Sequence, residues 1–306
     1  MASSNHANDR TNLTSRILPE MSLSPGRDAA LDARIDSLHP AARDSAAGRF
    51  SIAGNAIVTG GTGAIGTVVA RAMLQHGLAG LMLIDLNVAA SRDAVQALRR
   101  EFPAAKITAV EVDVTDEGAV AAAISEAVQL LGSVDMLVCL AGIVGCAHAL
   151  DMPVSQWRRI LDINTTGAFI CAQAAARQMV AQGRGGRIIF TASISAHRVN
   201  FPQPQVAYNV SKGALLMLKN SLAAEWAQYG ITVNSISPGY MDTVLNEGGR
   251  VGGGEEGLER EESGWEDGRA GGVGWGGGDD AEQGGELYEW GGCGCGWGRT
   301  CVLMCI

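Results

Sequence analysis

Lysine is the scarcest charged residue in this chain of 306 residues, with three copies at Lys106, Lys212 and Lys219. Basic residues number 23 and acidic residues 32, which gives a formal net charge of −9. A dedicated nucleic-acid binder needs basic patches that meet phosphates. The composition therefore excludes a nucleic-acid partner, and it makes the position of each lysine informative.

Long apolar runs are also absent from the sequence. No stretch approaches the ~20 apolar residues that span a bilayer. The N-terminal region lacks the apolar run of a secretory signal, and its arginines are matched by acids, which transit peptides lack. We therefore expect a cytoplasmic protein with no membrane partner.

Cysteine is not arranged as in a zinc site. Cys139, Cys146 and Cys171 lie in apolar surroundings, where a free cysteine behaves as a small hydrophobic residue. The other four crowd the last residues, and their spacing does not form two C-x-x-C pairs. We expect no metal site.

Three segments of different composition follow one another. Residues 1–49 are rich in Ser, Ala, Asn, Asp and Arg and have no sustained apolar period, which predicts a mostly disordered tail. Residues 248–306 are rich in glycine without a repeat, which predicts a low-complexity tail. Residues 50–247 between them are predicted to form one folded domain.

The middle segment alternates strand-like and helix-like runs. Its strands are nearly all apolar, which is typical of strands buried on both faces of a parallel sheet. Right-handed crossovers then predict an α/β fold of the Rossmann type, doubly wound, with strand order 3-2-1-4-5-6. The predicted strands are 56–59, 81–84, 107–112, 134–140, 187–191 and 231–235, and the predicted helices are 68–76, 91–102, 117–131, 154–182 and 206–228.

A glycine cluster lies between the first predicted strand and the helix after it. Gly61, Gly63 and Gly66 match the G-x-G-x-x-G spacing of dinucleotide-binding turns. Glycine is needed there because the turn is tight and a pyrophosphate must approach bare backbone at a helix N-terminus. Asp85 follows at the end of the second strand, where an acid accepts hydrogen bonds from the ribose hydroxyls. Since its charge would repel a 2′-phosphate, NAD is favoured over NADP.

Tyr208 and Lys212 lie four residues apart on a predicted helix, so they share one face. A free tyrosine has a pKa near ~10, and an adjacent ammonium group is expected to lower it toward a useful value. Ser193 follows the fifth strand at the sheet edge where such folds bind ligands. Its hydroxyl could bond the reacting oxygen beside Tyr208, and neighbouring Ser195 is an equal alternative.

Together these residues resemble the short-chain dehydrogenase/reductase family, single-domain type, over residues 51–247. The segment 234–248 is similar to fungal members that act on polyols and ketoses. Further matches to the family pattern fall in the family's order and are Asp113-Val114, Ala141-Gly142, Asn164, Pro238-Gly239 and Thr243.

The resemblance implies an NAD(P)-dependent oxidoreductase that interconverts a secondary alcohol and a ketone on a small molecule. It implies catalytic roles for Ser193, Tyr208, Lys212 and Asn164, the last through a water that leads to Lys212. The implied cofactor-binding residues are Gly60, Gly61, Thr62, Gly63, Ile65, Gly66, Asp85, Asp113, Val114, Ala141, Gly142, Asn164, Tyr208, Lys212, Pro238, Gly239 and Thr243.

The sequence departs from the family pattern in three places. Ala64 stands where glycine is usual, and Gly60, Gly63 and Gly66 also fit the spacing of extended members, which include epimerases and dehydratases. Cys139-Leu140 replaces a pair of asparagines. After residue 247 the expected substrate lid and seventh strand are not readable. These departures leave two alternatives, a truncated or non-catalytic nucleotide-binding relative and an epimerase or dehydratase, and they make a homo-oligomer conditional on the missing elements.

Overall fold

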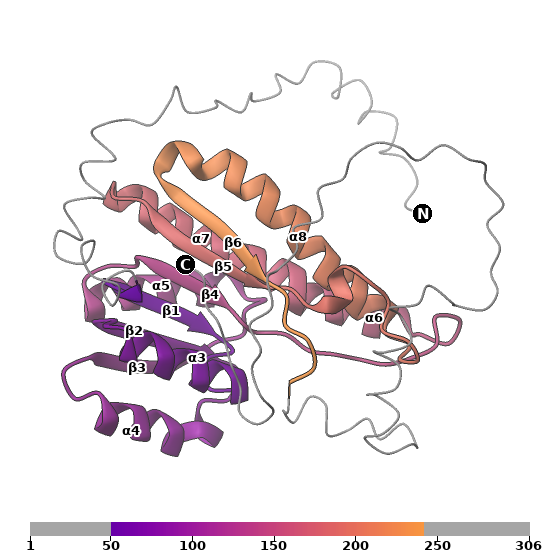
Figure 1. Ribbon diagram of the computed structural model, residues 1–306, viewed down its shortest axis with the longest axis horizontal. Coiled ribbons are helices and arrows are strands. Elements are labelled where there is room, and N and C mark those ends of the chain that lie inside the picture. Colours follow the sequence, from indigo (N-terminus) through magenta and orange to yellow (C-terminus); the bar gives the residue numbers. More distant parts are fainter. Residues whose placement is uncertain (1–49, 242–306) are drawn as a thin grey trace, which may run out of the picture. The chain divides into compact units, whose positions relative to one another are not determined.

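The structure is a computed structural model that describes residues 50–241 (Figure 1). The predicted tails at 1–49 and 248–306 lie outside the described residues. The predicted domain boundary at 247 and the region of the expected seventh strand lie outside them too.

The described residues form a parallel sheet of six strands in the order β3-β2-β1-β4-β5-β6. This confirms the predicted Rossmann-type order. Three central strands, β1, β2 and β4, are nearly continuous apolar runs, as is typical of strands buried on both faces. The bounds of the six strands are β1 Asn55–Thr59, β2 Gly80–Asp85, β3 Lys106–Glu111, β4 Met136–Cys139, β5 Gly186–Thr191 and β6 Ile231–Ile236.

Helices form a layer on each side of the sheet (Figure 1). α3 (Ala64–Gln75) and α4 (Arg92–Glu101) lie on one face. On the other face, α5 (Glu117–Leu131), α7 (Ala168–Gln182) and α8 (Val206–Trp226) build the main core with the strands. The short elements are η2 Ala89–Ser91, α6 Val154–Leu161, η3 Asp162–Gly167, η4 Ile194–Ala196 and η5 Ala227–Tyr229. Within residues 50–241, no helix is both long and apolar enough to cross a membrane.

The helical segment predicted over 154–182 is present, but its middle is not α-helical. Residues Asp162–Gly167 form a π-helical turn, η3, between α6 and α7. The side chain of Asn164 in this turn bonds the backbone of Ile143 through both its oxygen and its nitrogen. Contacts with a distant loop therefore override the regular helical period, and π-turns of this kind are frequent at functional sites.

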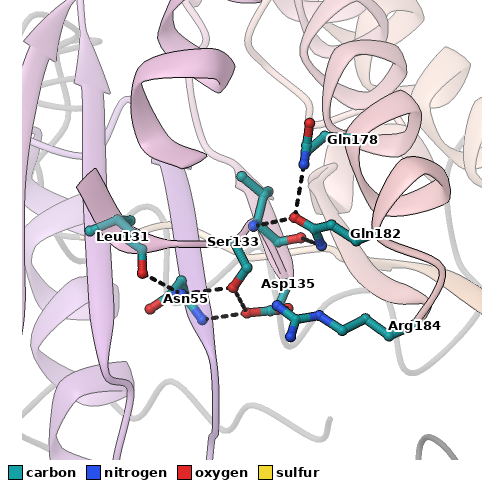
Figure 2. A network of polar contacts seen from close by, with 8 residues as sticks. Asn55, Leu131, Ser133, Asp135, Gln178, Gln182 and Arg184 are labelled. Atoms are coloured by element: carbon teal, nitrogen blue, oxygen red, sulfur yellow. Dashed lines mark hydrogen bonds and ion pairs between the residues drawn. The ribbon is translucent and has the colours of Figure 1, made fainter. Parts of the chain in front are cut away.

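Asp135, just before β4, is the centre of a polar cluster at the amino ends of β1, β4 and β5 (Figure 2). One of its carboxylate oxygens accepts hydrogen bonds from the Asn55 backbone N–H (2.9 Å) and the Ser133 hydroxyl (2.6 Å). The other forms an ion pair with Arg184 Nη2 at 2.9 Å. The Asn55 amide nitrogen donates in turn to Ser133 Oγ and the Leu131 carbonyl. These bonds tie the start of β1 to the start of β4.

The amide of Gln182 extends the same cluster (Figure 2). It accepts a hydrogen bond from the Val134 N–H and donates one to the Val134 carbonyl, both at 2.9 Å. Gln178 Nε2 donates to its oxygen at 3.1 Å. The C-terminal turn of α7 is thereby fixed to the chain that enters β4. We call the side chains of Asn55, Ser133, Asp135, Gln178, Gln182 and Arg184 the amino-edge network.

Candidate active site

The glycines of the turn between β1 and α3 are required for different structural reasons. Gly60 has a φ of +62°, and a Cβ there would lie 2.8 Å from the Ala141 backbone nitrogen. A Cβ on Gly61 would lie 2.6 Å from the Val58 carbonyl oxygen, and one on Gly66 would lie 2.7 Å from Gly61 Cα. These three glycines are required by close packing of the turn itself.

Gly63 differs, because a Cβ there would meet only the Gly60 carbonyl oxygen, at 3.4 Å. It is exposed and forms the N-cap of α3 without a side-chain cap. The first turn of α3, with half-buried Ile65, therefore offers uncapped backbone N–H groups beside open space. This arrangement fits the pyrophosphate of a dinucleotide, which binds at such a helix N-terminus.

Asp85 closes the turn from the end of β2. One oxygen of its carboxylate accepts a hydrogen bond from the backbone N–H of buried Thr62 at 3.1 Å. This contact sets the carboxylate beside the glycine turn, as the sequence motif predicts. A carboxylate accepts several hydrogen bonds, so the bond to Thr62 leaves capacity for ribose hydroxyls.

Asp113 and Val114 follow β3. Asp113 Oδ1 accepts hydrogen bonds from Thr115 N (2.9 Å) and Thr115 Oγ1 (2.7 Å), and these bonds hold the pKa of Asp113 below its usual value. Val114 is buried, and a Cβ on Gly167 of η3 would lie 2.7 Å from its side chain. The loop after β3 is therefore packed directly on the π-turn.

Ala141 and Gly142, after β4, lie beside residues predicted to be catalytic. Ala141 N donates to Thr59 Oγ1 at 3.3 Å, which attaches this loop to the end of β1. A Cβ on Gly142 would lie 3.1 Å from Asn164 Oδ1 and 3.5 Å from Lys212 Nζ. Gly142, Asn164 and Lys212 therefore converge on one point, and a side chain at position 142 would press on the Asn164 amide.

Lys212 is buried, with 5% of its surface exposed. Its ammonium donates to the Thr191 carbonyl at 2.7 Å and lies 5.7 Å from the centre of the Tyr208 ring. Burial lowers the pKa of Lys212 to about 8. The first turns of α8 thus bring Tyr208 and Lys212 to the end of β5, as their i, i+4 spacing predicts.

The direction of the Tyr208 pKa corrects the expectation from sequence. Burial raises the pKa of Tyr208, and a hydrogen bond from Ser193 opposes that rise only in part. The Lys212 ammonium does not determine the direction in which the Tyr208 pKa shifts, because it is directed at the Thr191 carbonyl. The pKa of Tyr208 therefore lies above its usual value.

The structure separates the two candidate serines. Ser193 bonds Tyr208, and its Oγ also accepts a hydrogen bond from Ser195 N at 3.1 Å. The Ser195 hydroxyl instead accepts a hydrogen bond from Asn200 Nδ2 at 2.8 Å. Ser193 is consequently the serine that lies at the Tyr208 phenol.

Pro238 and Gly239 follow β6 beside this serine. The Pro238 carbonyl accepts a hydrogen bond from Ile194 N at 3.0 Å, and a Cβ on Gly239 would meet nothing within 4 Å. The predicted cofactor residue Thr243 lies outside the described residues. All the other predicted site residues follow strand ends at the carboxyl edge of the sheet or contact that edge from η3 and α8, which is where open α/β sheets bind ligands.

Two residues at this edge were not singled out by the sequence. Ser211 lies between the predicted pair, and its hydroxyl contacts both Asn164 and the Tyr208 backbone. The backbone carbonyl of Thr191 accepts a hydrogen bond from the Lys212 ammonium. The position of Ser211 next to Lys212 was a usable signal, but a backbone carbonyl leaves none in the sequence.

Comparison with known proteins agrees with this geometry. A sequence model of the family described as "short chain dehydrogenase" matches residues 54–250. A D-arabinitol 2-dehydrogenase (ribulose-forming) of Scheffersomyces stipitis is 36% identical over 201 residues, which cover 62% of this chain and 72% of that protein.

Two solved structures extend the comparison. A gluconate 5-dehydrogenase from Burkholderia cenocepacia, in complex with NADP and tartrate, is 32% identical with a TM-score of 0.62, and the match covers 67% of this chain and 78% of that one. An NAD⁺-bound xylitol dehydrogenase is 34% identical with a TM-score of 0.57, over 68% of this chain and 74% of that one. With the glycine turn, the six-stranded order and the Ser193–Tyr208–Lys212 arrangement, these matches show that the chain belongs to the short-chain dehydrogenase family, whose members are NAD(P)-dependent oxidoreductases acting on CH–OH groups.

Proposed function

We propose that this chain oxidises a secondary alcohol of an open-chain polyol to a ketose and catalyses the reverse reduction, with NAD as the favoured cofactor. The observation that carries the proposal is the meeting of Ser193, Tyr208 and Lys212 at the carboxyl edge, next to the glycine turn. The relatives named above act on arabinitol, xylitol and gluconate, which are all open-chain polyhydroxy compounds.

The same geometry supports a place for the dinucleotide. The uncapped first turn of α3 at Gly63 suits the pyrophosphate, and Asp85 suits the adenosine ribose. Asp113 and Val114 would hold the adenine side, while Ala141, Gly142, Lys212, Pro238, Gly239 and Thr243 would hold the nicotinamide side. A bound nicotinamide supplies the hydride chemistry, and the protein contributes placement and electrostatics.

Each of the three central side chains has a distinct task. Ser193 holds the substrate oxygen beside the Tyr208 phenol. Tyr208 takes the proton of the alcohol in oxidation and returns it in reduction. Lys212, with a pKa of about 8, is charged at neutral pH and stabilises the phenolate that forms when Tyr208 loses its proton. Asn164 is proposed to hold a water through which that proton reaches solvent.

The preference for NAD is supported by Asp85, whose carboxylate would repel a 2′-phosphate. Residues 59–66 contain no Arg or Lys that would offset this charge. The related structures include one with NAD⁺ and one with NADP, so the argument depends on Asp85 itself. We expect kcat/KM for NAD to exceed that for NADP by about tenfold or more, the ratio that 1.4 kcal/mol gives.

The test uses the full chain with D-arabinitol and xylitol, and with 2-butanol as a simple secondary alcohol. The polyols are expected to be oxidised with formation of NADH. Tyr208→Phe is expected to lower kcat by about 10³-fold, in line with the usual contribution of a general acid or base, while the Kd for NAD stays within a factor of two. Tyr229→Phe, in η5, is the matched control and should leave turnover intact.

Two outcomes would overturn the proposal. Turnover of the polyols that survives Tyr208→Phe would remove Tyr208 from the mechanism. NAD binding without turnover of any alcohol would favour a non-catalytic nucleotide-binding protein.

A further inference from the structure

Ser211 is completely buried in the second turn of α8. Its hydroxyl donates to the Tyr208 carbonyl at 2.8 Å and accepts from Asn164 Nδ2 at 3.0 Å. Lys212 is the next residue along the chain. This one hydroxyl group therefore contacts two elements at once. It bonds the π-turn through Asn164, and it bonds the backbone of Tyr208, which lies three residues before Ser211.

The direction of these bonds determines how the Asn164 side chain is oriented. A serine hydroxyl can donate one hydrogen bond, and Ser211 donates it to the backbone carbonyl of Tyr208. Only lone pairs of Ser211 face Asn164, so Asn164 must present its NH₂ group and not its oxygen. The remaining proton of that NH₂ group goes to the Ile143 carbonyl, and the oxygen accepts from Ile143 N. The amide of Asn164 is thus held in one orientation, and its oxygen keeps a second lone pair for the proposed water.

A second hydroxyl joins the same two elements. Thr165, also in η3, donates through Oγ1 to the Ser211 carbonyl at 3.1 Å. α8 is therefore attached to η3 by side-chain bonds at both the hydroxyl and the carbonyl of Ser211. Since Asn164 Oδ1 and Lys212 Nζ both lie near Gly142, this attachment sets the spacing between η3 and the catalytic face of α8.

We propose that Ser211 is a positioning residue for the reaction: its hydroxyl holds the Tyr208–Lys212 turn of α8 against the Asn164 turn and so keeps the Tyr208 phenol at Ser193. The proposal rests on the proposed function, because it assigns Tyr208 as the group that exchanges the proton. It assigns to Ser211 no contact with substrate or cofactor.

A physical consequence distinguishes this role from simple stabilisation. The hydrogen bond from Ser193 favours the ionised form of Tyr208. Loss of the Ser211 hydroxyl lets the first turns of α8 move relative to β5, which lengthens that bond. The pKa of Tyr208 then rises, and the pH at which alcohol oxidation reaches half of its maximum rises with it.

The experiment compares Ser211→Ala with two controls. Ser125→Ala in α5 removes an exposed serine whose hydroxyl bonds only its own helix, at the Ala121 carbonyl. Leu222→Val removes one buried methylene about three turns after Ser211 in α8 and lowers stability. For each variant we would measure the thermal midpoint, the Kd for NAD, and kcat and KM for D-arabinitol between pH 6 and 10.

A second measurement needs neither substrate nor cofactor. The phenol groups are titrated by ultraviolet absorbance in each protein and in its Tyr208→Phe counterpart, and the difference gives Tyr208 alone among the four tyrosines of the chain. This titration tests the position of Ser211 even if no polyol is turned over, so the two proposals can fail separately.

For Ser211→Ala we expect kcat to fall by about 10- to 100-fold, the range that small misplacement of a catalytic group produces, with KM and the Kd for NAD within a factor of two. Both the pH profile and the phenol titration are expected to move to higher pH by about 0.5 or more. Ser125→Ala and Leu222→Val should move neither. The proposal is overturned if Ser211→Ala titrates Tyr208 like the wild type, or if Leu222→Val shifts it equally.

Discussion

The two ends of the parallel sheet carry polar clusters of opposite character. In the amino-edge network, both oxygens of Asp135 and both polar atoms of the Gln182 amide are bonded to other groups of the protein (Figure 2). At the carboxyl edge, Lys212 has three donors and contacts one carbonyl, and Gly63 faces open space. In the first cluster the central carboxylate and amide are satisfied by the protein, and one buried nitrogen, Arg184 Nε, has no partner among the described residues. The second cluster has capacity left for a ligand.

This difference gives a physical criterion for telling a structural network from a site. Buried polar groups that are satisfied by each other rigidify a fold. Groups held in place by packing but left with free donors or acceptors are available for chemistry. The criterion predicts that substitutions at the two edges affect different properties, and the following experiments test that separation.

The largest expected effect is on turnover at the carboxyl edge. Lys212→Met keeps a long side chain but removes the ammonium, and we expect kcat to fall by about 10³-fold. The free energy of unfolding at pH 7 should stay equal or rise, because a buried charge no longer has to be desolvated. Lys219→Met, two turns further along α8, is the control and should change neither property.

The same variant has a signature in the pH dependence of stability. The pKa of Lys212 is about 8 in the folded chain and returns to its usual value near 10.5 in the unfolded chain. Between these pH values the unfolded state binds more protons, so this lysine makes the folded state more stable as pH rises from 8 to 10.5. Denaturant unfolding at pH 8 and 10 should show that the gain is lost in Lys212→Met. An identical gain in the variant would contradict the burial of the charge.

The second effect is on stability at the amino edge. Asp135→Ala removes one ion pair and two hydrogen bonds, and we expect it to lower the free energy of unfolding by about 3 kcal/mol. Turnover per folded molecule should not change, since the network lies at the opposite end of the strands. Asp151→Ala, at an exposed turn, should stay within about 0.5 kcal/mol of the wild type. If Asp135→Ala lowered kcat without loss of stability, the separation between the edges would be wrong.

The smallest effect concerns the core beneath the carboxyl edge. Burial raises the pKa of the Cys171 thiol from 9.0 to about 12. Above pH 9 the folded state therefore retains a proton that the unfolded state loses, so stability falls as pH rises. Between pH 9 and 10 this contribution is about 1 kcal/mol.

The measurement compares unfolding at pH 9 and 10 in the wild type and in Cys171→Ala. From pH 9 to 10, the change in the free energy of unfolding should be about 1 kcal/mol more favourable in Cys171→Ala than in the wild type, whatever the stability at pH 7, because Lys212 contributes equally to both. Exposed Cys146→Ala serves as the control and should behave like the wild type. An unchanged slope in Cys171→Ala would mean that the thiol ionises as easily in the fold as in water.

The strands and the glycine turn could be predicted because their causes are local. Most strands are apolar runs, and the G-x-G-x-x-G spacing lies where a strand meets a helix. The pair Tyr208 and Lys212 followed from helix geometry alone. Thr243 and the tails stay predictions, since they lie outside the described residues.

What could not be predicted depends on contacts between distant segments. The π-helical turn at Asp162–Gly167 goes together with bonds between Asn164 and Ile143, 21 residues apart. The choice of Ser193 over Ser195 required the partner of each hydroxyl, which only the folded loop shows. The rise in the Tyr208 pKa required knowledge of how deeply the ring and Lys212 are buried.

The π-turn also has a consequence for the register of the chain. A regular helix rotates by about 100° for each residue, so the one extra residue of a π-turn rotates everything that follows it by that angle. α7 presents small side chains to the sheet at Ala168, Cys171, Ala172, Ala175 and Ala176. Deletion of one residue from η3 would turn that small-residue stripe away from the strands. The π-turn that contains Asn164 thus also sets the rotation of α7 about its axis, and with it the face that α7 packs on the sheet.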